Sequence, residues 1–519
     1  MMSKLLGELH GRFARDRLFQ AFVVSGGLFA ILLLLFARAM ARELNHDEQQ
    51  FIAPAALLLR DGLLPYRDYP LFHVPNLVFV FAGLFATTSH LLLAARCFNT
   101  LCAAILIGLV LAVAVRRFRP LPEMRWLVAL TFVVILILNP FFRFTAGRAW
   151  NHDLAVLATV AGFVALLHAA NSERGWLWIA IGGVLLGIAV GTRVSFAPLV
   201  APFALITLLF PARRLRRSVS LAIFLVTVAL ALIPTALLWL TAPSEFLFGT
   251  FIFNARIDAL YEQSVAPRSF PPLRRLVFPG ILLLKSPSDL ALVAGFAFFG
   301  LRPLWRDGWR KFESHRESAA LALLMPFLFL GAWAPPISYA QYYYVFVPFL
   351  LLGNVYGIAR DGPWRARNTR LMAVVVLAGL AETVPDLRYT PTILQPDRWP
   401  VITTHKTGAV IRALLPKGRV LTLAPLLPLE GNLEIYKELA TGPFAWRIAP
   451  FVDKQSQVAF DILDPADLDD FLEAQPPAAI LTGFEYEKKL DAPLVSYAQR
   501  HGYSSRSLPE RGILWLPTR

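Results

Sequence analysis

Eleven long apolar runs dominate the sequence between residues 18 and 384, and they constrain the fold more than any other feature. A helix that crosses a bilayer needs about 20 consecutive apolar residues. We therefore predict a polytopic α-helical membrane protein with about eleven transmembrane helices in residues 1–386. The predicted spans are 18–37, 91–115, 126–142, 154–170, 176–191, 196–210, 219–240, 282–301, 319–333, 342–359 and 371–384.

The composition supports this fold class and excludes another. Hydrophobic residues make up 56% of the chain, against about 45–50% in soluble domains. The net charge of +15 is compatible with nucleic-acid binding, but the arginines lie in short loops between apolar runs instead of on one soluble face. We therefore expect no nucleic-acid partner. The first run is longer than the apolar part of a usual signal peptide, so we expect it to be retained as a span.

A twelfth apolar stretch, at 71–84, decides the topology. If it does not cross, the basic loops at 116–119, 213–217, 302–316 and 360–370 all fall on the side of the amino terminus, as the positive-inside tendency requires. If it crosses, they fall opposite the basic amino terminus. We therefore predict an amphipathic or re-entrant helix at the outer surface, inside an outer loop 38–90. The predicted location is the cytoplasmic (inner) membrane, with the amino terminus inside.

The composition changes after the last apolar run. Short β-like runs occur at 420–424, 478–482 and 513–516, and a helical pattern covers 485–500. Residues 387–519 are therefore predicted to form an α/β domain, which the topology places outside the cytoplasm.

Two acidic clusters fall on the predicted outer side. Asp47 and Glu48 follow His46 shortly after the first run, and Asp153 follows His152 at the start of a later one. Each cluster has a structural alternative, because Asn45 or Asp153 can cap a helix. Their equivalent depth favours a shared site.

Cations and tyrosines on the same side are further candidates. A phosphate is one partner that matches arginine in bidentate fashion, although each cation singly can be a snorkelling or ion-paired residue. Tyr342 and Tyr343 fit either an interfacial belt or the wall of a sugar or lipid cleft. The outer cations are Arg67, His73, Arg148, Arg193, Arg256 and Arg268.

The order of these motifs resembles the first outer loop of GT-C glycosyltransferases. The resemblance rests on the acidic pair, on Gly62–Tyr69 (Gly-Leu-Leu-Pro-Tyr-Arg-Asp-Tyr) and on His73–Pro75 (His-Val-Pro), and it covers about residues 15–385. The branch it resembles is the family 39-like enzymes, which include protein O-mannosyltransferases and the lipid A aminoarabinose transferase. The latter tend to show Lys-Pro-Pro where this chain has His-Val-Pro, which leaves their substrate in doubt here.

The resemblance implies roles for particular residues. Asp47 matches the catalytic acid and Asp153 the acid of the second outer loop, while His73 and Arg193 stand near family residues that meet the lipid phosphate. A polyprenyl-phosphate sugar would be the donor, and Asp47 would act as general base on the hydroxyl of an extracytoplasmic glycan, lipid or protein, with inversion. Some relatives use a divalent metal, so Mg²⁺ or Mn²⁺ on Asp47, Glu48 and Asp153 stays an open alternative.

Two other functions compete with this hypothesis. A transporter would be expected to show paired repeats and charges near mid-membrane, and the sequence shows no internal repeat. A lipid-linked polysaccharide polymerase or ligase is the enzymatic alternative, although such enzymes generally carry a large outer loop late in the span series.

Overall fold

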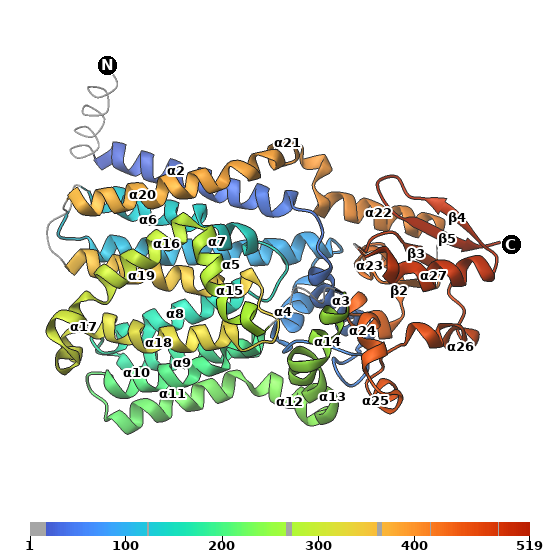
Figure 1. The fold of residues 1–519 in the computed structure, drawn as a ribbon, viewed down its shortest axis with the longest axis horizontal. Helices are drawn as coiled ribbons and strands as arrows, with labels where there is room; N and C mark the ends of the chain where they lie inside the picture. The colour runs from blue at the N-terminus through green and yellow to red at the C-terminus, as the bar shows by residue number, and fades with distance from the viewer. Residues whose placement is uncertain are drawn as a thin grey trace, which may run out of the picture.

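Long helices lie side by side in a bundle, and the C-terminal segment lies at one end of it (Figure 1). The computed structural model describes residues 17–121, 124–265, 272–360, 366–415, 417–485 and 487–518. The bundle helices are α2 (Arg17–Ala41), α5 (Leu91–Arg117), α6 (Arg125–Leu138), α8 (Asp153–Ala169), α9 (Gly175–Thr192), α10 (Val200–Leu209), α11 (Arg217–Ala231), α12 (Ile233–Thr241), α15 (Pro272–Lys285), α16 (Pro287–Gly295), α18 (Arg316–Trp333), α19 (Phe346–Arg360) and α20 (Ala366–Thr383).

Several of these helices are long and apolar enough to cross a membrane. Among the described residues five single helices meet that test, or up to seven if each of two bent helix pairs is one span. One pair, α11 with α12, is bent by 50° at Leu232. All eleven predicted runs are helical, but runs such as 126–142 and 154–170 form helices of only 14 and 17 residues. The count of eleven spans therefore stays a prediction.

The segment 71–84 does not form a spanning helix. Its helix, α4 (Asn76–Phe85), has 10 residues and is therefore about 15 Å long, half the thickness of a bilayer core. It packs against α3 (His46–Asp61), and both lie at the end of the bundle that faces the C-terminal segment (Figure 1). This agrees with the prediction of a short helix inside the loop 38–90.

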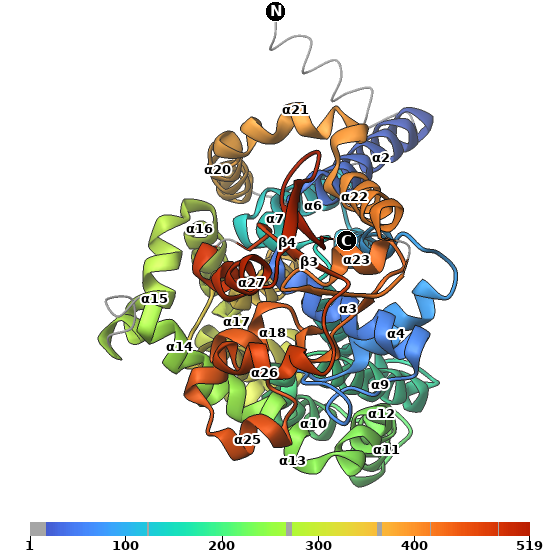
Figure 2. The same ribbon diagram turned by 90° about the vertical axis from the view of Figure 1, so that its right-hand side faces the viewer.

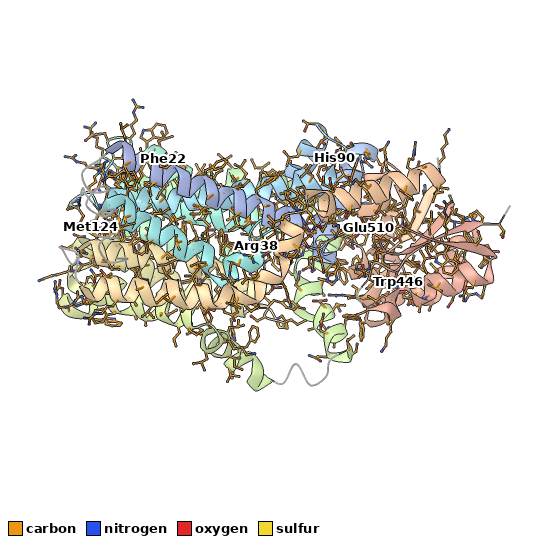
Figure 3. The ribbon with its side chains drawn as sticks, turned by 90° about the horizontal axis from the view of Figure 1, so that it is seen from above. Phe22, Arg38, His90, Met124, Trp446 and Glu510 are labelled. Carbon is orange, nitrogen blue, oxygen red and sulfur yellow. The ribbon has the colours of Figure 1, made fainter. Side chains whose placement is uncertain are left out.

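The basic loops gather at the other end. Arg217 lies 4.0 Å from Glu313, and Arg316 donates to the Asn171 side chain. In Figure 3, Met124, which follows the 116–119 loop, and Trp446 of the C-terminal segment lie at opposite ends of the molecule. The described parts of the basic loops 213–217 and 302–316 therefore lie together at one end of the bundle (Figure 1).

The C-terminal segment contains a five-stranded mixed sheet with the order β2-β1-β3-β5-β4. β1 is parallel to β2 and β3, and β5 is antiparallel to β3 and β4. The strands are β1 (Arg419–Thr422), β2 (Glu434–Ile435), β3 (Ala479–Thr482), β4 (Tyr503–Ser507) and β5 (Ile513–Pro517). The three predicted β-like runs are β1, β3 and β5. The prediction missed β2, which has two residues, and β4, whose residues are mostly exposed and polar.

The C-terminal segment is joined to the bundle by polar contacts as well as by apolar packing. Glu430, at the end of α23 (Leu426–Glu430), accepts a hydrogen bond from the Leu92 amide in the first turn of α5. Its other oxygen lies 2.7 Å from His405 of α22 (Pro400–Leu414). Figure 2 looks at the molecule from this end and shows α23 next to α3. The helix α23 is therefore held against α5 and α3.

Candidate active site

Local sequence fixes the start of α3. The Asn45 side chain accepts from the Asp47 amide, and the Glu48 carboxylate accepts from the Asn45 amide, so the two ends form a capping box. Gly62 closes the helix with a φ of +67°, a conformation that glycine adopts without strain. The two neighbouring acids consequently leave the first turn in different directions.

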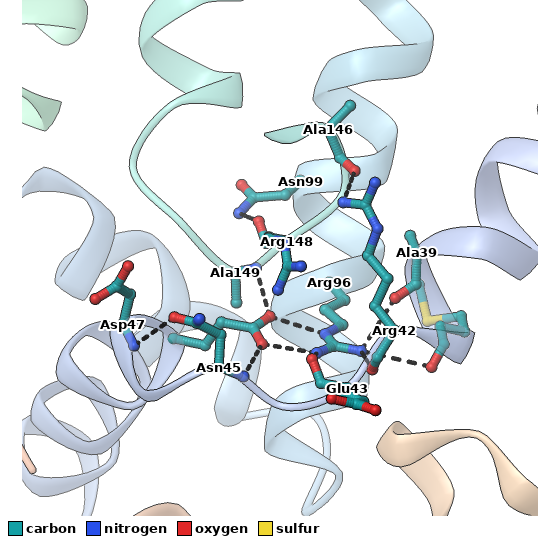
Figure 4. A network of polar contacts seen from close by, with 12 residues as sticks. Ala39, Arg42, Glu43, Asn45, Asp47, Arg96, Asn99, Ala146, Arg148 and Ala149 are labelled. Atoms are coloured by element: carbon teal, nitrogen blue, oxygen red, sulfur yellow. Dashed lines mark hydrogen bonds and ion pairs between the residues drawn. The ribbon is translucent and has the colours of Figure 1, made fainter. Parts of the chain in front are cut away.

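Glu48 is fully buried and paired. Both of its oxygens accept hydrogen bonds from Arg96 of α5, at 2.8 and 2.6 Å, and one also accepts from the Ala149 amide at 2.9 Å. Arg96 has no exposed surface, and its remaining donors are used by carbonyls just before α3, including that of Arg42. Figure 4 shows this network, with the Asp47 carboxylate pointing away from Arg96. Glu48 therefore holds the two outer loops together.

Asp47 faces a different set of partners. One of its oxygens lies 3.3 Å from the His46 Nε2, and the other ring nitrogen of His46 lies 3.9 Å from the Glu485 carboxylate. Glu485 follows β3 in the C-terminal segment, and its side chain is only 3% exposed. His46 is therefore placed between two carboxylates that are more than 430 residues apart in the chain.

Burial and neighbouring charges shift the pKa values of Asp47, His46 and Glu485. Burial opposes ionisation of Asp47, but the hydrogen bond and charge of His46, with the charge of Arg447, hold the pKa of Asp47 below its usual value. Burial lowers the pKa of His46, but the opposing effect of Asp47 and Glu485 is larger. The pKa of His46 is therefore above its usual value. Burial raises the pKa of Glu485 to about 7, against the pull of His46. Asp47 is thus the carboxylate of the pair that stays ionised.

His152 of the second outer loop meets Arg193 of the turn after α9. Arg193, which ends α9, donates to the Asn151 side chain at 2.9 Å and lies 2.9 Å from the His152 Nε2. Because arginine has no acceptor, the His152 nitrogen accepts and that ring is neutral. The Arg193 guanidinium also lies 4.4 Å from the centre of the Tyr342 ring. His152, Arg193 and Tyr342 line a narrow crevice that also includes Ser195.

Asp47 and His73 of the first outer loop and Arg193 influence one another's ionisation. Burial and the charge of Arg193 lower the pKa of His73 to about 3, and Asp47 opposes that shift. Burial likewise lowers the pKa of Arg193, and the charge of Asp47 opposes that shift. The His73 ring stacks on Phe51 of α3 at 5.0 Å. Asp47, His73 and Arg193 therefore share one electrostatic environment at the same end of the bundle.

Asp153 lies at the same end but is more enclosed. It is 2% exposed, and one oxygen accepts from the Gly147 amide at 2.8 Å. The bond between Glu48 and the Ala149 amide ties its loop to α3. Asp47 and Asp153 are therefore not on opposite sides of the bundle, and Asp153 supports the turn that leads into α8.

Other predicted site residues lie elsewhere. Arg67 is half exposed and forms a bidentate pair with its neighbour Asp68. Arg256 is exposed on the π-helix η2 (Phe248–Ile257). Tyr343 is buried, with its hydroxyl 3.1 Å from that of Ser338.

Two predicted cations remain. The Arg148 guanidinium donates to the Phe144 carbonyl and lies 4.9 Å from the Trp150 ring. It therefore lies in the second outer loop among aromatic side chains. Arg268 lies outside the described residues.

The three predicted acids do not fit a metal. No group of three or more His, Cys, Asp or Glu side chains in the described parts of the chain is arranged to hold an ion. Glu48 is bound on both oxygens by Arg96, and it faces away from the groups that contact Asp47. Asp47, Glu48 and Asp153 are therefore not a ligand set, and no step below depends on one.

Sequence reasoning missed two residues of the C-terminal segment. Glu485 contacts His46. Arg447 pairs with Asp258 at 2.6 Å, and its positive charge lowers the pKa of Asp47. A signal for Glu485 was present, because it lies three residues beyond a predicted buried strand. No pattern in the sequence connects either residue to the first outer loop.

Comparison with known proteins bears on the fold. No protein-family model matches the chain, and no curated protein matches it. Solved structures do resemble it. The lipid A aminoarabinose transferase ArnT of Cupriavidus metallidurans, bound to undecaprenyl phosphate, is 16% identical over 95% of this chain and 98% of its own, with a TM-score of 0.54. The apo state of the same enzyme gives a TM-score of 0.56 at 13% identity, covering 96% and 98%.

A second enzyme shares the arrangement. The apo oligosaccharyltransferase of Archaeoglobus fulgidus is 13% identical over 96% of this chain and 75% of its own, with a TM-score of 0.51. Both enzymes are members of the GT-C class. The chain therefore has a GT-C fold, as the resemblance in its first outer loop predicts. At these identities the comparison establishes the fold alone.

Proposed function

We propose that the protein is an inverting glycosyltransferase that moves a sugar from a polyprenyl-phosphate donor to an acceptor hydroxyl outside the cytoplasm. The observation that carries the proposal is the site itself. An ionised carboxylate, Asp47, and a buried cation, Arg193, come from two different loops and share one electrostatic environment on a GT-C fold.

The donor phosphate is assigned to Arg193, with His73 and Arg148 beside it. Arg193 uses two of its nitrogens on Ser195 and Asn151, which orients the guanidinium. Guanidinium groups match phosphate oxygens in bidentate fashion and stay charged. Tyr342, under Arg193, supplies an aromatic face for the sugar or the first isoprene units. His152 accepts from Arg193 and keeps it in place.

The chemical step is a single displacement. The acceptor oxygen attacks the anomeric carbon, the bond from that carbon to the donor phosphate oxygen breaks, and the acceptor proton passes to the Asp47 carboxylate. Polyprenyl phosphate leaves with the electron pair, and Arg193 stabilises the charge that gathers on it. Because attack is opposite to the leaving group, the configuration at the anomeric carbon inverts.

His46 and Glu485 are assigned as positioning residues. A protonated His46 donates to Asp47 and holds its carboxylate toward the acceptor, while Glu485 stabilises the imidazolium on the other side. Glu48 is likewise assigned to positioning, since Arg96 and two backbone amides occupy its oxygens. Arg67 and Arg256 have no part in the proposed step.

The comparisons support the donor class. One structural neighbour was crystallised with undecaprenyl phosphate, a lipid with the phosphate and prenyl chain that the proposed donor carries. The location in the cytoplasmic membrane, with the site and residues 387–519 outside, belongs to the proposal and rests on the distribution of arginines between the two ends of the bundle.

The test is turnover of prenyl-phosphate sugars by the full-length protein in vesicles. Wild type and Asp47→Asn are compared with a panel of donors, and released polyprenyl phosphate and the anomeric configuration of the product are measured. We expect one donor class to be consumed with inversion, and a loss of about 10²–10⁴-fold in the variant. Equal rates in wild type and variant, or retention of configuration, would overturn the assignment of Asp47.

A further inference from the structure

A separate cavity of about 380 Å³ lies at the end of the bundle remote from the C-terminal segment. It is formed mainly by the last turns of α5 and α8 and the start of α18. Figure 3 shows that the turn after α5, which leads to Met124, lies at this end. The cavity shares none of its lining residues with the crevice beside Arg193, so the transfer site does not account for it.

One half of the cavity wall is apolar. Leu109 and Val113 of α5 and Val164 and Leu167 of α8 line it, and the first three are only partly buried in the protein. These helices contact each other along the bundle. A ligand that fills this half must therefore have a hydrocarbon part that extends along the helices.

The other half is cationic, and among the described residues its arginines outnumber the carboxylates paired with them. Four arginines line it, Arg116, Arg117, Arg119 and Arg316. A single carboxylate, that of Glu317, lies 2.7 Å from Arg117 and 3.7 Å from Arg316. Within the described ranges of the chain, neither Arg116 nor Arg119 has an ion pair.

Two other described carboxylates at this end pair with arginines that do not line the cavity. Glu173 pairs with Arg213 and Arg214, and Glu313 lies beside Arg217. The Arg117 guanidinium is positioned by Tyr356 of α19, because it lies 4.6 Å from the centre of that ring. The cavity therefore presents an oriented excess of guanidinium groups next to an apolar wall.

We propose that this cavity binds one anionic phospholipid of the leaflet at the basic end of the bundle. Its phosphate would be bound by Arg116 and Arg119, with Arg316 at the edge, and one acyl chain would lie along Leu109, Val113 and Leu167. Arginine recognises phosphate oxygens in bidentate fashion. Basic pockets between transmembrane helices on the cytoplasmic side bind anionic headgroups for the same reason.

A free phosphate or a nucleotide would satisfy only the cationic half. The apolar half favours a lipid, because exposed hydrocarbon would otherwise line a water-filled space. The inference does not depend on the glycosyl-transfer proposal. Its test measures binding, and it can fail or succeed whatever reaction occurs at the other end.

The experiment uses the full-length protein in a neutral detergent after removal of bound lipid. Native mass spectrometry follows retention of phosphatidylglycerol, of phosphatidylcholine with the same acyl chains, and of inorganic phosphate. We expect one phosphatidylglycerol to be retained at concentrations where phosphatidylcholine is retained at least tenfold less. The double variant Arg116→Gln/Arg119→Gln should reduce that retention at least tenfold.

The matched control is Arg213→Gln/Arg214→Gln, at the same end of the bundle but with side chains 66% and 74% exposed. It should retain phosphatidylglycerol like wild type. Val113→Trp, which fills the apolar half and leaves the arginines in place, should also lose the lipid, and it keeps the test decisive if the arginine variant does not fold. Equal retention of phosphatidylcholine, full retention by the cavity variants, or displacement of the lipid by millimolar phosphate would overturn the proposal.

Discussion

The His46 imidazole lies between two carboxylates, 3.3 Å from that of Asp47 in its own helix and 3.9 Å from that of Glu485 in the C-terminal segment. Its ring also meets the Phe444 ring edge-on at 5.5 Å. Glu485, a buried acid among the last 40 residues, is therefore separated from the proposed base Asp47 only by the His46 side chain.

Glu485→Gln should move the alkaline limb of the pH–rate profile to lower pH. Asp47 and Glu485 raise the pKa of His46, while burial and Arg447 lower it. Removal of the Glu485 charge therefore lowers the pKa of His46, and the imidazolium that holds Asp47 is lost at a lower pH. A shift of about 1 pH unit is expected for a charge this close. The control is Glu434→Gln, whose side chain is 70% exposed, and an unchanged alkaline limb in Glu485→Gln would contradict the role of Glu485.

His46→Gln should affect the opposite limb. Asp47 acts as base only when ionised, so activity falls as the pH drops through its pKa. Burial raises that pKa, and the bond from His46 lowers it. Without His46 the burial effect remains, the pKa of Asp47 rises, and the acid limb of kcat/KM moves to higher pH. Profiles of kcat/KM report the free enzyme, and an acid limb that does not move would show that another group controls it.

Substitutions of Asp47 and of Glu48 should have different effects, one on turnover and the other on stability. Asp47→Asn should reduce turnover about 10²–10⁴-fold and lower the melting temperature less than Glu48→Gln does, since its side chain is 29% exposed and its pair with His46 is partly exposed. Glu48→Gln should destabilise the fold by about 3–5 kcal/mol, because it leaves Arg96 as an uncompensated buried charge. Thermal melts in detergent and turnover in vesicles measure both. Equal melting temperatures for the two variants would contradict this assignment.

Arg193→Gln should raise KM for the lipid donor by about 10- to 100-fold, the value of one or two charged hydrogen bonds. Arg256→Gln is the matched control, since this arginine is exposed on η2. Its KM should equal that of wild type. If the two variants behave alike, the donor phosphate binds elsewhere.

Glu430→Ala should loosen the C-terminal segment. The carboxylate accepts from the Leu92 amide and contacts His405, whose ring stacks on His90 at 3.7 Å. Loss of this buried acceptor should destabilise the junction by about 1–3 kcal/mol and speed cleavage by a protease between residues 386 and 400. Glu434→Ala serves as control. Cleavage of Glu430→Ala at the wild-type rate would show that apolar packing alone holds the segment.

The helical bundle could be predicted from the sequence, because long apolar runs have few alternatives in a bilayer. The short helix α4 could be excluded as a span from charge alone, and three of five strands stood out as apolar runs between turns. The length of α6 could not be predicted, since Asn139 ends that helix inside the apolar run 126–142.

The site was only partly predictable. Asp47 and Arg193 could be found from their place at the ends of apolar runs, but sequence gave no way to separate Asp47 from Glu48. That separation depends on Arg96, a charge inside an apolar run, and such a residue needs a buried partner whose identity only the fold supplies. Glu485 was missed because its contact joins the two ends of the chain.

The position of Glu485 also has a consequence for biosynthesis. Asp47 emerges from the ribosome with the first tenth of the polypeptide, whereas its distant companion is translated among the final 40 residues. In the proposed enzyme the nascent chain would insert its helices among donor lipids while the reaction centre is still incomplete. The proposed enzyme would therefore stay inactive until the C-terminal segment has folded onto the bundle, which would prevent hydrolysis or misdirected transfer during insertion.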